Sequence, residues 1–177
     1  MDEADNNRLA ELLIELAKGN SQVLSEIALL MQKILYSVGI MYFKNKEDTE
    51  DSIQELYIIL YKKAKWFRQN TSASAWIMAI YRNWIKSQLR KRKVEDRYVK
   101  SEMQDVKTQV HSMDEKYIED RLYLKEIMSK LSDYERDLII YYHWCKCTVR
   151  EVAKILHKPR ATIDNHLKKL EQKVKEM

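Results

Sequence analysis

The sequence has almost none of the residues that tight strand turns require. Its 177 residues include only two glycines and one proline, and these two residue types supply many of the backbone conformations found in turns. Lys, Glu, Leu and Ala are abundant instead, and all four are strong helix formers. We therefore expect an all-α protein in which each half of the chain buries a modest helical core.

Cysteines and long apolar runs are also scarce. The only cysteines, Cys145 and Cys147, are separated by one residue, which gives no disulfide framework and fits a reducing compartment. The longest apolar run, around residues 34–43, is too short and too interrupted to cross a bilayer, and the polar N-terminus does not resemble a signal peptide. We expect a cytoplasmic protein that makes no contact with a membrane.

The sequence shows no recognisable constellation for catalysis or metal binding. It has no paired-histidine motif and no glycine-rich phosphate loop. His143, Cys145, Cys147 and His157 are spaced so that a helix would direct them to different sides, which disfavours zinc. The acids at residues 47–51 could serve a two-metal nuclease, but a helix N-terminus also favours acids. We therefore expect neither catalytic residues nor a metal or cofactor.

Cations gather on one predicted helix near the middle of the chain. The formal net charge is only +5, but Arg82, Lys86, Arg90 and Lys93 share one helical face, here called the charged stripe. Another face of the same helix carries apolar residues at four-residue spacing, which we interpret as core: Trp76, Ile80 and Trp84. A basic helix end can serve solubility alone, but a row of four cations favours binding to nucleic-acid phosphates.

Apolar periodicity predicts three helices before the charged stripe. They cover residues 8–18, residues 21–43 and residues 48–66, with Gly19 as a stop after the first. Asp48 is expected to begin the third helix, because acids in a first turn suit the helix dipole. The third helix is expected to bury five side chains: Ile53, Leu56, Tyr57, Leu60 and Tyr61.

The pattern weakens after Lys93. Acids outnumber bases between residues 101 and 120, and few large apolar residues occur there, so this stretch cannot bury much of itself. We predict a flexible acidic linker at residues 96–120, between a helical domain at residues 1–95 and a second one at residues 121–177. A further amphipathic helix is expected to begin near Tyr117.

The second domain is predicted to contain a helix-turn-helix. Two capping boxes mark helix starts, Ser132 with Glu135 and Thr148 with Glu151. After the second box come two apolar helical faces, separated by the short break HKP at residues 157–159. If the last helix enters a major groove, its exposed face can contact phosphates and base edges. That face carries Arg160, Thr162, Asn165, His166, Lys168 and Lys169.

Two sets of motifs resemble one known family. The first set is DTEDSIQELY at residues 48–57, followed by Ala75-Trp76-Ile77, Ile80, Asn83 and Arg90. The second set is Leu131, Glu135-Arg136, Glu151-Val152-Ala153 and Thr162-Ile163. In order and spacing they are similar to the small two-domain sigma factors of bacterial RNA polymerase, the extracytoplasmic-function (ECF) type of the sigma-70 family. The resemblance covers nearly the whole chain.

This resemblance implies a non-catalytic subunit that binds core RNA polymerase, at its clamp and flap regions, and directs promoter recognition and DNA opening at transcription initiation. The first domain would then bind polymerase and open the downstream promoter element, and the second would recognise the upstream element. The implied polymerase-binding residues are Asp48, Asp51, Gln54, Glu55 and Ile58. The implied downstream contacts are Trp66, Phe67, Arg68, Arg82, Asn83, Lys86, Arg90 and Lys93.

Three positions depart from the family pattern. His157 stands where the turn usually has glycine, so this turn is expected to avoid a left-handed backbone. Asp164 would face DNA with the wrong charge unless a neighbour such as Lys168 neutralises it, and Ser87 replaces an aspartate. We therefore expect weak upstream recognition, with an anti-sigma factor or another DNA-positioning factor as a further partner. The competing classes are a helix-turn-helix regulator that does not join polymerase and a nucleic-acid-processing enzyme.

Overall fold

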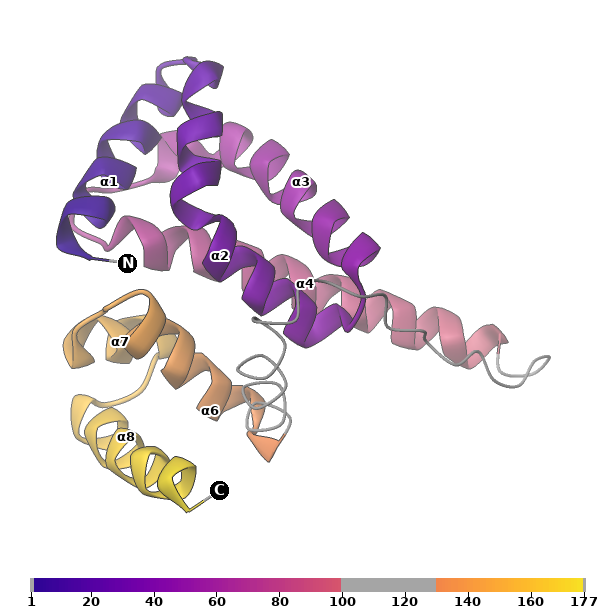
Figure 1. Ribbon diagram of the computed structural model, residues 1–177, viewed down its shortest axis with the longest axis vertical. Coiled ribbons are helices and arrows are strands. Elements are labelled where there is room, and N and C mark those ends of the chain that lie inside the picture. Colours follow the sequence, from indigo (N-terminus) through magenta and orange to yellow (C-terminus); the bar gives the residue numbers. More distant parts are fainter. Residues whose placement is uncertain (1, 100–129, 177) are drawn as a thin grey trace, which may run out of the picture.

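The computed structural model describes residues 2–99 and 130–176, with side chains described for residues 2–93 and 130–176. All regular elements in these two ranges are helical, which confirms the all-α prediction. They form two lobes that lie against each other (Figure 1). The predicted linker and the helix expected near Tyr117 lie outside the described residues, except that α4 continues past the predicted domain boundary at residue 95.

The N-terminal lobe (residues 2–99) contains four α-helices and the C-terminal lobe (residues 130–176) contains three. The N-terminal elements are α1 (Glu3–Ala17), the 3-10 turn η1 (Ser21–Val23), α2 (Leu24–Phe43), α3 (Lys46–Lys63), the 3-10 turn η2 (Ala64–Trp66) and α4 (Ala73–Val99). The C-terminal elements are α6 (Asp133–Leu138), the π-helix η4 (Ile139–Trp144), α7 (Val149–Leu156) and α8 (Arg160–Lys175).

Side-chain caps explain most of the helix starts. Both predicted capping boxes are present, at Ser132 before α6 and at Thr148 before α7. Gly19 stops the first helix with a φ of 97°. The third helix begins at Lys46 rather than at Asp48, because the Asn45 side chain accepts a hydrogen bond from the Asp48 backbone N–H at 2.8 Å and so supplies an earlier cap.

Four helices surround the core of the N-terminal lobe. Leu9, Leu13 and Met31 are fully buried there, and Leu56 and Leu60 extend from α3 into the same core as predicted. Tyr61 was predicted to be buried but is 49% exposed. It lies one position beyond Leu60, on the rim of the apolar face, where a long side chain reaches solvent.

Helix α2 packs closely against its neighbours at Gly39. A Cβ atom at this position would lie 2.5 Å from the Tyr81 hydroxyl and 2.7 Å from the Thr49 methyl. The same Tyr81 hydroxyl forms a 2.7 Å hydrogen bond with the buried Ser52 hydroxyl. The absence of a side chain at Gly39 therefore lets α2, α3 and α4 meet around one satisfied polar pair.

One helical stretch among the described residues, Ser21–Phe43, is long and apolar enough by length and composition to cross a membrane. From the sequence, the longest apolar run was expected to be too short for this. In this fold the stretch supplies core residues: Ile27, Met31, Leu35 and Val38 have no exposed surface. The core helix of a globular protein can have the same length and composition.

The helix-turn-helix is formed by α7 and α8, and its turn differs from the prediction. His157 adopts the left-handed conformation, with φ 52° and ψ 45°, so the expectation that histidine would change the turn geometry is wrong. The His157 and Lys158 backbone N–H groups donate to carbonyls in the last turn of α7, and these hydrogen bonds offset the modest cost of a left-handed residue.

Candidate polymerase and nucleic-acid interfaces

The outer face of α3 is open to solvent. Helical spacing directs Leu56 and Leu60 into the core and leaves the opposite side exposed. The exposed side, here called the α3 surface, carries Asp51, Gln54, Glu55, Ile58 and Lys62. Ile58 is 49% exposed and lies among polar groups, a mixture that is common at protein–protein interfaces. Four of the five residues assigned to polymerase binding thus share one surface.

Asp48, the fifth of those residues, is engaged within the lobe. Its carboxylate accepts two hydrogen bonds from the Arg92 guanidinium, at 2.5 and 2.6 Å, and a third from the Asn45 side-chain amide at 2.7 Å. The bonds from Arg92 lower the pKa of Asp48 to about 2, although partial burial opposes the shift. Asp48 therefore joins the start of α3 to the distal part of α4.

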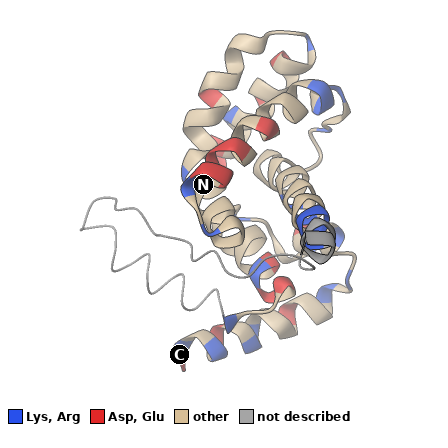
Figure 2. Ribbon diagram, turned by 90° about the vertical axis from the view of Figure 1, so that its right-hand side faces the viewer, with Lys and Arg blue, Asp and Glu red and all other residues tan. Residues whose placement is uncertain are grey.

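The charged stripe is only partly exposed. Arg90 and Lys93 are open to solvent near the end of α4, where Figure 2 shows blue cationic residues gathered. The Lys86 side chain is 37% exposed, and Asn83 lies beside the stripe in solvent. Arg82 is only 4% exposed, so the prediction that all four cations form one open row is wrong for Arg82.

Arg82 is buried because it contacts the C-terminal lobe. Its Nη2 atom forms an ion pair with the Asp137 carboxylate, whose side chain is 8% exposed. The second carboxylate oxygen lies 3.7 Å from Lys86 Nζ. Burial and the nearby Arg82 charge lower the pKa of Lys86. Asp137 thus lies between two cations of the charged stripe.

Sequence reasoning did not identify Asp137. The signal that could have found it is its spacing: Asp137 precedes Tyr141 by four residues, and both lie in the otherwise apolar stretch DLIIYY. An acid on the buried face of a helix requires a partner. The identity of that partner, 55 positions earlier in the chain, could not be read from local periodicity.

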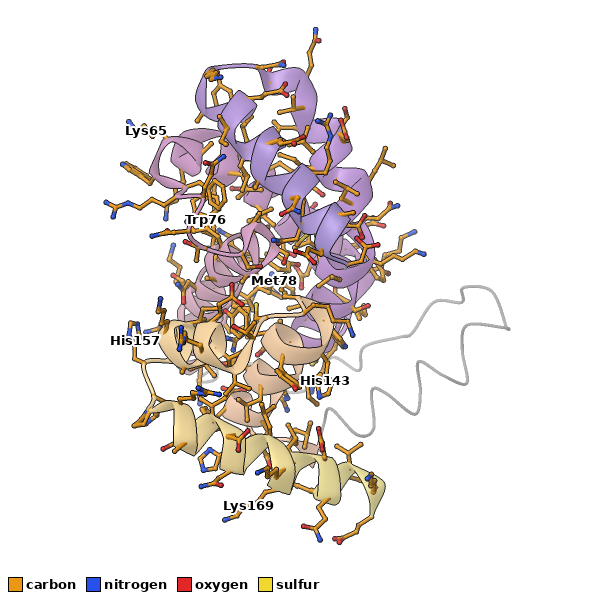
Figure 3. The ribbon with its side chains drawn as sticks, turned by 90° about the vertical axis from the view of Figure 1, so that its left-hand side faces the viewer. Lys65, Trp76, Met78, His143, His157 and Lys169 are labelled. Carbon is orange, nitrogen blue, oxygen red and sulfur yellow. The ribbon has the colours of Figure 1, made fainter. Side chains whose placement is uncertain are left out.

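An aromatic corner follows α3. Trp66 is 60% exposed, and Lys65 Nζ lies 5.1 Å from the centre of its ring. Phe67 instead packs edge-to-face on Trp76, with ring centres 5.4 Å apart. Figure 3 shows Lys65 projecting outward on this side of the lobe. Of the two aromatic residues implied as downstream contacts, Trp66 has an exposed ring and Phe67 packs against the core.

The predicted outer face of α8 is present, with one residue turned inward. Arg160, Asn165, Lys168 and Lys169 are exposed and Thr162 is half-buried; Figure 3 shows Lys169 directed into solvent. His166 is half-buried, and its Nδ1 lies 3.0 Å from the Tyr134 hydroxyl. Lys168 pairs with Asp164 at 3.1 Å, the neutralisation that the sequence required for Asp164 to face DNA.

The two cysteines are free and buried. Burial raises the pKa of the Cys147 thiol to about 12 and raises that of Cys145 further. Within residues 2–99 and 130–176, no group of three or more His, Cys, Asp or Glu side chains could hold a metal ion. The acidic run lies at the start of α3, where the helix dipole favours acids, and Asp48 in addition pairs with Arg92.

Two sequence families match the chain, one on each lobe. The family described as Sigma-70 region 2 matches residues 30–95, and the family described as Sigma-70, region 4 matches residues 121–174. Together they cover the α3 surface, the charged stripe and the helix-turn-helix. No curated protein matches the chain.

Two solved structures are similar to the fold. One is CnrH in complex with the cytosolic domain of CnrY, with 13% sequence identity, a TM-score of 0.67 and 94% of each chain covered. The other is the sigma factor RpoE in complex with the anti-sigma factor NepR from Bartonella quintana, with 21% identity, a TM-score of 0.67, and 86% of this chain and 94% of that chain covered. At these identities the similarity concerns the fold.

Proposed function

The chain belongs to the sigma-70 family and is a sigma factor of the ECF type, and from this premise we propose how its two lobes contribute to initiation. A sigma factor binds core RNA polymerase and directs promoter recognition and DNA opening. We propose that the first predicted domain, residues 1–95, docks on polymerase and opens the downstream element, and that the second, residues 121–177, makes the upstream contacts. Residues 96–120 connect the two domains, and α4 extends into the first part of this segment, to Val99.

The α3 surface is the proposed docking site for polymerase. Asp51, Gln54, Glu55 and Ile58 are exposed on one side of a helix whose other side is fixed in the core. A rigid helix presents its side chains at low entropic cost, which favours affinity. This exposure is the single observation that carries the assignment, since a helix-turn-helix regulator acting alone has no need of such a surface. Asp48 contributes by holding α3 and α4 in place.

The charged stripe and the aromatic corner are the proposed site of DNA opening. Arg90, Lys93 and Lys86 can neutralise phosphates of one strand. The exposed Trp66 ring can stack on an unpaired base, and the exposed Arg68 and Asn83 supply further polar groups. Phe67 supports this corner through its contact with Trp76. The combination of exposed cations and a free ring suits a melted strand better than an intact duplex.

The upstream contact is assigned to α8. Arg160 and Lys169 are free to reach phosphates, and Asn165 can reach a base edge. His166 is hydrogen-bonded to Tyr134, and Lys168 forms an ion pair with Asp164. These contacts leave fewer side chains of α8 available to contact DNA bases directly. We propose weak upstream recognition that depends on the polymerase to position the lobe.

A protein partner that covers the factor is a further part of the proposal. Both similar structures were determined with a bound partner, which in one is named an anti-sigma factor. We propose that an anti-sigma factor regulates this chain as well. Sigma-70 proteins are not enzymes, and we assign no catalytic activity to the chain. RNA polymerase is cytoplasmic, and we propose that the factor acts there.

Polymerase binding by paired variants tests the docking assignment. Asp51→Ala with Gln54→Ala should weaken binding to core polymerase about tenfold, because it removes two polar contacts from one surface. The matched control is Asn7→Ala with Gln32→Ala, which alters exposed polar residues on α1 and α2 and should leave affinity unchanged. Thermal melting monitors folding of both variants. If both variants bind core polymerase as tightly as the unmodified protein, the α3 surface is not the docking site.

A further inference from the structure

We propose that Asn6 of α1 is a positioning residue for DNA opening, which holds the α3–α4 loop (residues 67–72) in the geometry that binds an unpaired strand. Asn6 acts through Ser72 and Ser74 and needs no contact with DNA. This inference rests on the proposed role of the aromatic corner in DNA opening, and it adds a residue that lies outside both sets of family motifs.

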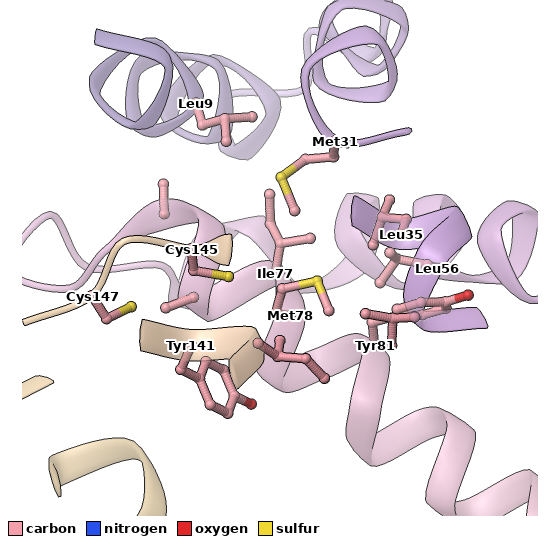
Figure 4. Close-up of a cluster of buried hydrophobic side chains, with 14 of the residues drawn as sticks. Leu9, Met31, Leu35, Leu56, Ile77, Met78, Tyr81, Tyr141, Cys145 and Cys147 are labelled. Atoms are coloured by element: carbon pink, nitrogen blue, oxygen red, sulfur yellow. The ribbon is translucent and has the colours of Figure 1, made fainter. Parts of the chain in front are cut away.

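Asn6 lies on the buried side of α1. Leu9 and Leu13, three and seven positions later, are fully buried, and helical spacing places Asn6 on the same stripe. Figure 4 shows Leu9 in the buried cluster that also contains Ile77 of α4. Asn6 is itself half-buried, and a polar side chain on such a stripe needs hydrogen-bond partners. Its partners belong to the start of α4.

Three donors at the start of α4 converge on the side-chain oxygen of Asn6. The Ser72 hydroxyl donates at 3.0 Å, the Ser74 backbone N–H at 3.0 Å and the Ser74 hydroxyl at 3.1 Å. Both serines are buried. The Ser74 N–H lies in the first turn of α4, where a backbone N–H has no acceptor within the helix. Without the Asn6 oxygen, this N–H would be buried and unpaired, which is costly.

Asn6 thereby acts as a second cap of α4. The helix begins at Ala73, and the Ser72 hydroxyl accepts from the Ala75 backbone N–H at 3.4 Å, which is the local N-cap bond. That bond is long. The shorter bond to the same helix start comes from Asn6, which is 68 positions from Ser74 in the chain. The end of the α3–α4 loop is therefore fixed by α1 as well as by the local sequence.

The α3–α4 loop is held at both ends and exposed between them. At its start, the Phe67 backbone N–H donates to the Ala64 carbonyl at 2.9 Å, and the Phe67 ring packs against the core. Residues 68–70 are exposed. The Thr71 N–H then donates to the Arg68 carbonyl at 3.1 Å, which closes a tight turn. The far end of this turn is the end that Asn6 holds.

A fixed loop favours capture of an unpaired strand. A strand that binds mobile side chains must order them, and this ordering costs free energy. A loop that is already ordered presents Arg68 next to the exposed Trp66 ring without that cost. Because Asn6 contacts Ser72 and Ser74, polymerase docking through the α3 surface should not depend on it. Asn6 is therefore expected to affect DNA opening separately from polymerase binding.

Open-complex formation by the holoenzyme tests the proposal. A promoter would be chosen from the start sites that core polymerase uses with the full chain, and unpaired thymines in the duplex would be detected with permanganate. Asn6→Ala should lower the equilibrium constant for opening about fivefold, the typical effect of losing one helix cap, with unchanged affinity for core polymerase. The matched control is Asn7→Ala, at the adjacent exposed asparagine. Equal opening by Asn6→Ala and the unmodified protein would overturn the proposal.

Two further substitutions separate the hydrogen bonds from packing. Asn6→Asp keeps an acceptor near the N-terminus of α4, where a carboxylate is favoured, and should open DNA within about twofold of the unmodified protein. Asn6→Leu keeps the side-chain volume without an acceptor and should show the loss of about fivefold. It also serves if Asn6→Ala disturbs folding, which thermal melting would reveal. Full opening by Asn6→Leu, or an equal loss for Asn6→Asp, would contradict the positioning role.

A double-mutant cycle tests whether Asn6 acts through the loop. Asn6→Ala should cause little further loss of opening once Arg68→Ala is present, because both changes disable the same element. Asn6→Ala and Lys93→Ala should instead be additive, since Lys93 lies in the distal part of α4. If both pairs are additive, or if polymerase affinity falls as much as opening does, Asn6 has only a structural role and the proposal is wrong.

Failure of the proposed function gives a different result. If the unmodified holoenzyme opens no promoter, the proposed DNA opening fails, and the role of Asn6 fails with it. If Trp66→Ala opens the promoter as well as the unmodified protein does, the aromatic corner is not the site of opening. If Trp66→Ala is impaired and Asn6→Ala is not, the aromatic corner stands and only the role of Asn6 is wrong.

Discussion

Asp48 shows how one residue in a motif can have a structural role. It was grouped with the polymerase-binding residues on the α3 surface, but its carboxylate is held by Arg92 and Asn45 within the lobe. Arg92 also lies over the Phe43 ring at 5.4 Å. A residue can thus support binding by fixing the angle between α3 and α4, without touching the partner.

This role predicts a pH-dependent contribution to stability. Because the pKa of Asp48 is lowered from 3.8 to about 2, its contribution is present at neutral pH and is lost as pH falls from about 4 towards 2. Asp48→Asn should therefore lower the free energy of unfolding by about 1 kcal/mol at pH 7, and by much less near pH 2.

Urea titrations at the two pH values measure this difference. Asp51→Asn is the matched control, since it makes the same change at an exposed position one turn along α3. If Asp48→Asn lowers the free energy of unfolding equally at pH 7 and pH 2, the ion pair with Arg92 is not the cause of the loss.

Gly39 gives a second prediction at the residue scale. A Cβ atom there would clash with the Tyr81 hydroxyl and the Thr49 methyl, so Gly39→Ala should destabilise the protein by about 2 kcal/mol, despite the better helix propensity of alanine. Thermal melting against Gln32→Ala, an exposed control on the same helix, measures the effect. An unchanged or higher melting temperature for Gly39→Ala would contradict the close crossing of α2, α3 and α4.

At the scale of elements, local patterns in the sequence predicted most of the helices. The capping boxes at Ser132 and Thr148 were confirmed because they depend on side chains three residues apart. The burial of Arg82 could not be predicted in this way, because its partner Asp137 belongs to a different lobe. His157 was predicted wrongly because residue preference was weighed without the hydrogen bonds that the turn provides.

The candidate sites show the same difference between features that local sequence predicts and features that depend on tertiary contacts. The family resemblance implied the polymerase-binding residues on α3, and Gln54, Glu55 and Ile58 are exposed together. Trp66 and Phe67 were both implied as downstream contacts, because periodicity cannot distinguish exposed from buried side chains at the end of a helix. The packing of Phe67 on Trp76 separates them.

The exposed part of the charged stripe carries a prediction of its own. Arg90→Ala with Lys93→Ala should weaken DNA binding on all sequences and reduce the slope of log affinity against log salt by about 1.5, since each cation releases close to one counterion. The control is Lys18→Ala with Lys33→Ala, two exposed cations at the C-terminal end of α1 and on α2. An unchanged salt slope for the stripe variant would place the DNA elsewhere.

At the scale of the whole molecule, the two lobes combine separate surfaces with one shared contact. Region 2 and region 4 of the sigma-70 family fall on different lobes, and the lobes meet where Asp137 covers Arg82.

Transcription in a reconstituted system tests the central claim most directly. Core polymerase would be supplied with genomic DNA and the full chain, and the 5′ ends of the transcripts would be sequenced. The account predicts transcripts that begin at defined sites with a shared upstream and downstream motif, and that fall about tenfold when Asp51→Ala and Gln54→Ala are combined. The same transcripts from core polymerase alone, or none with the factor present, would contradict it.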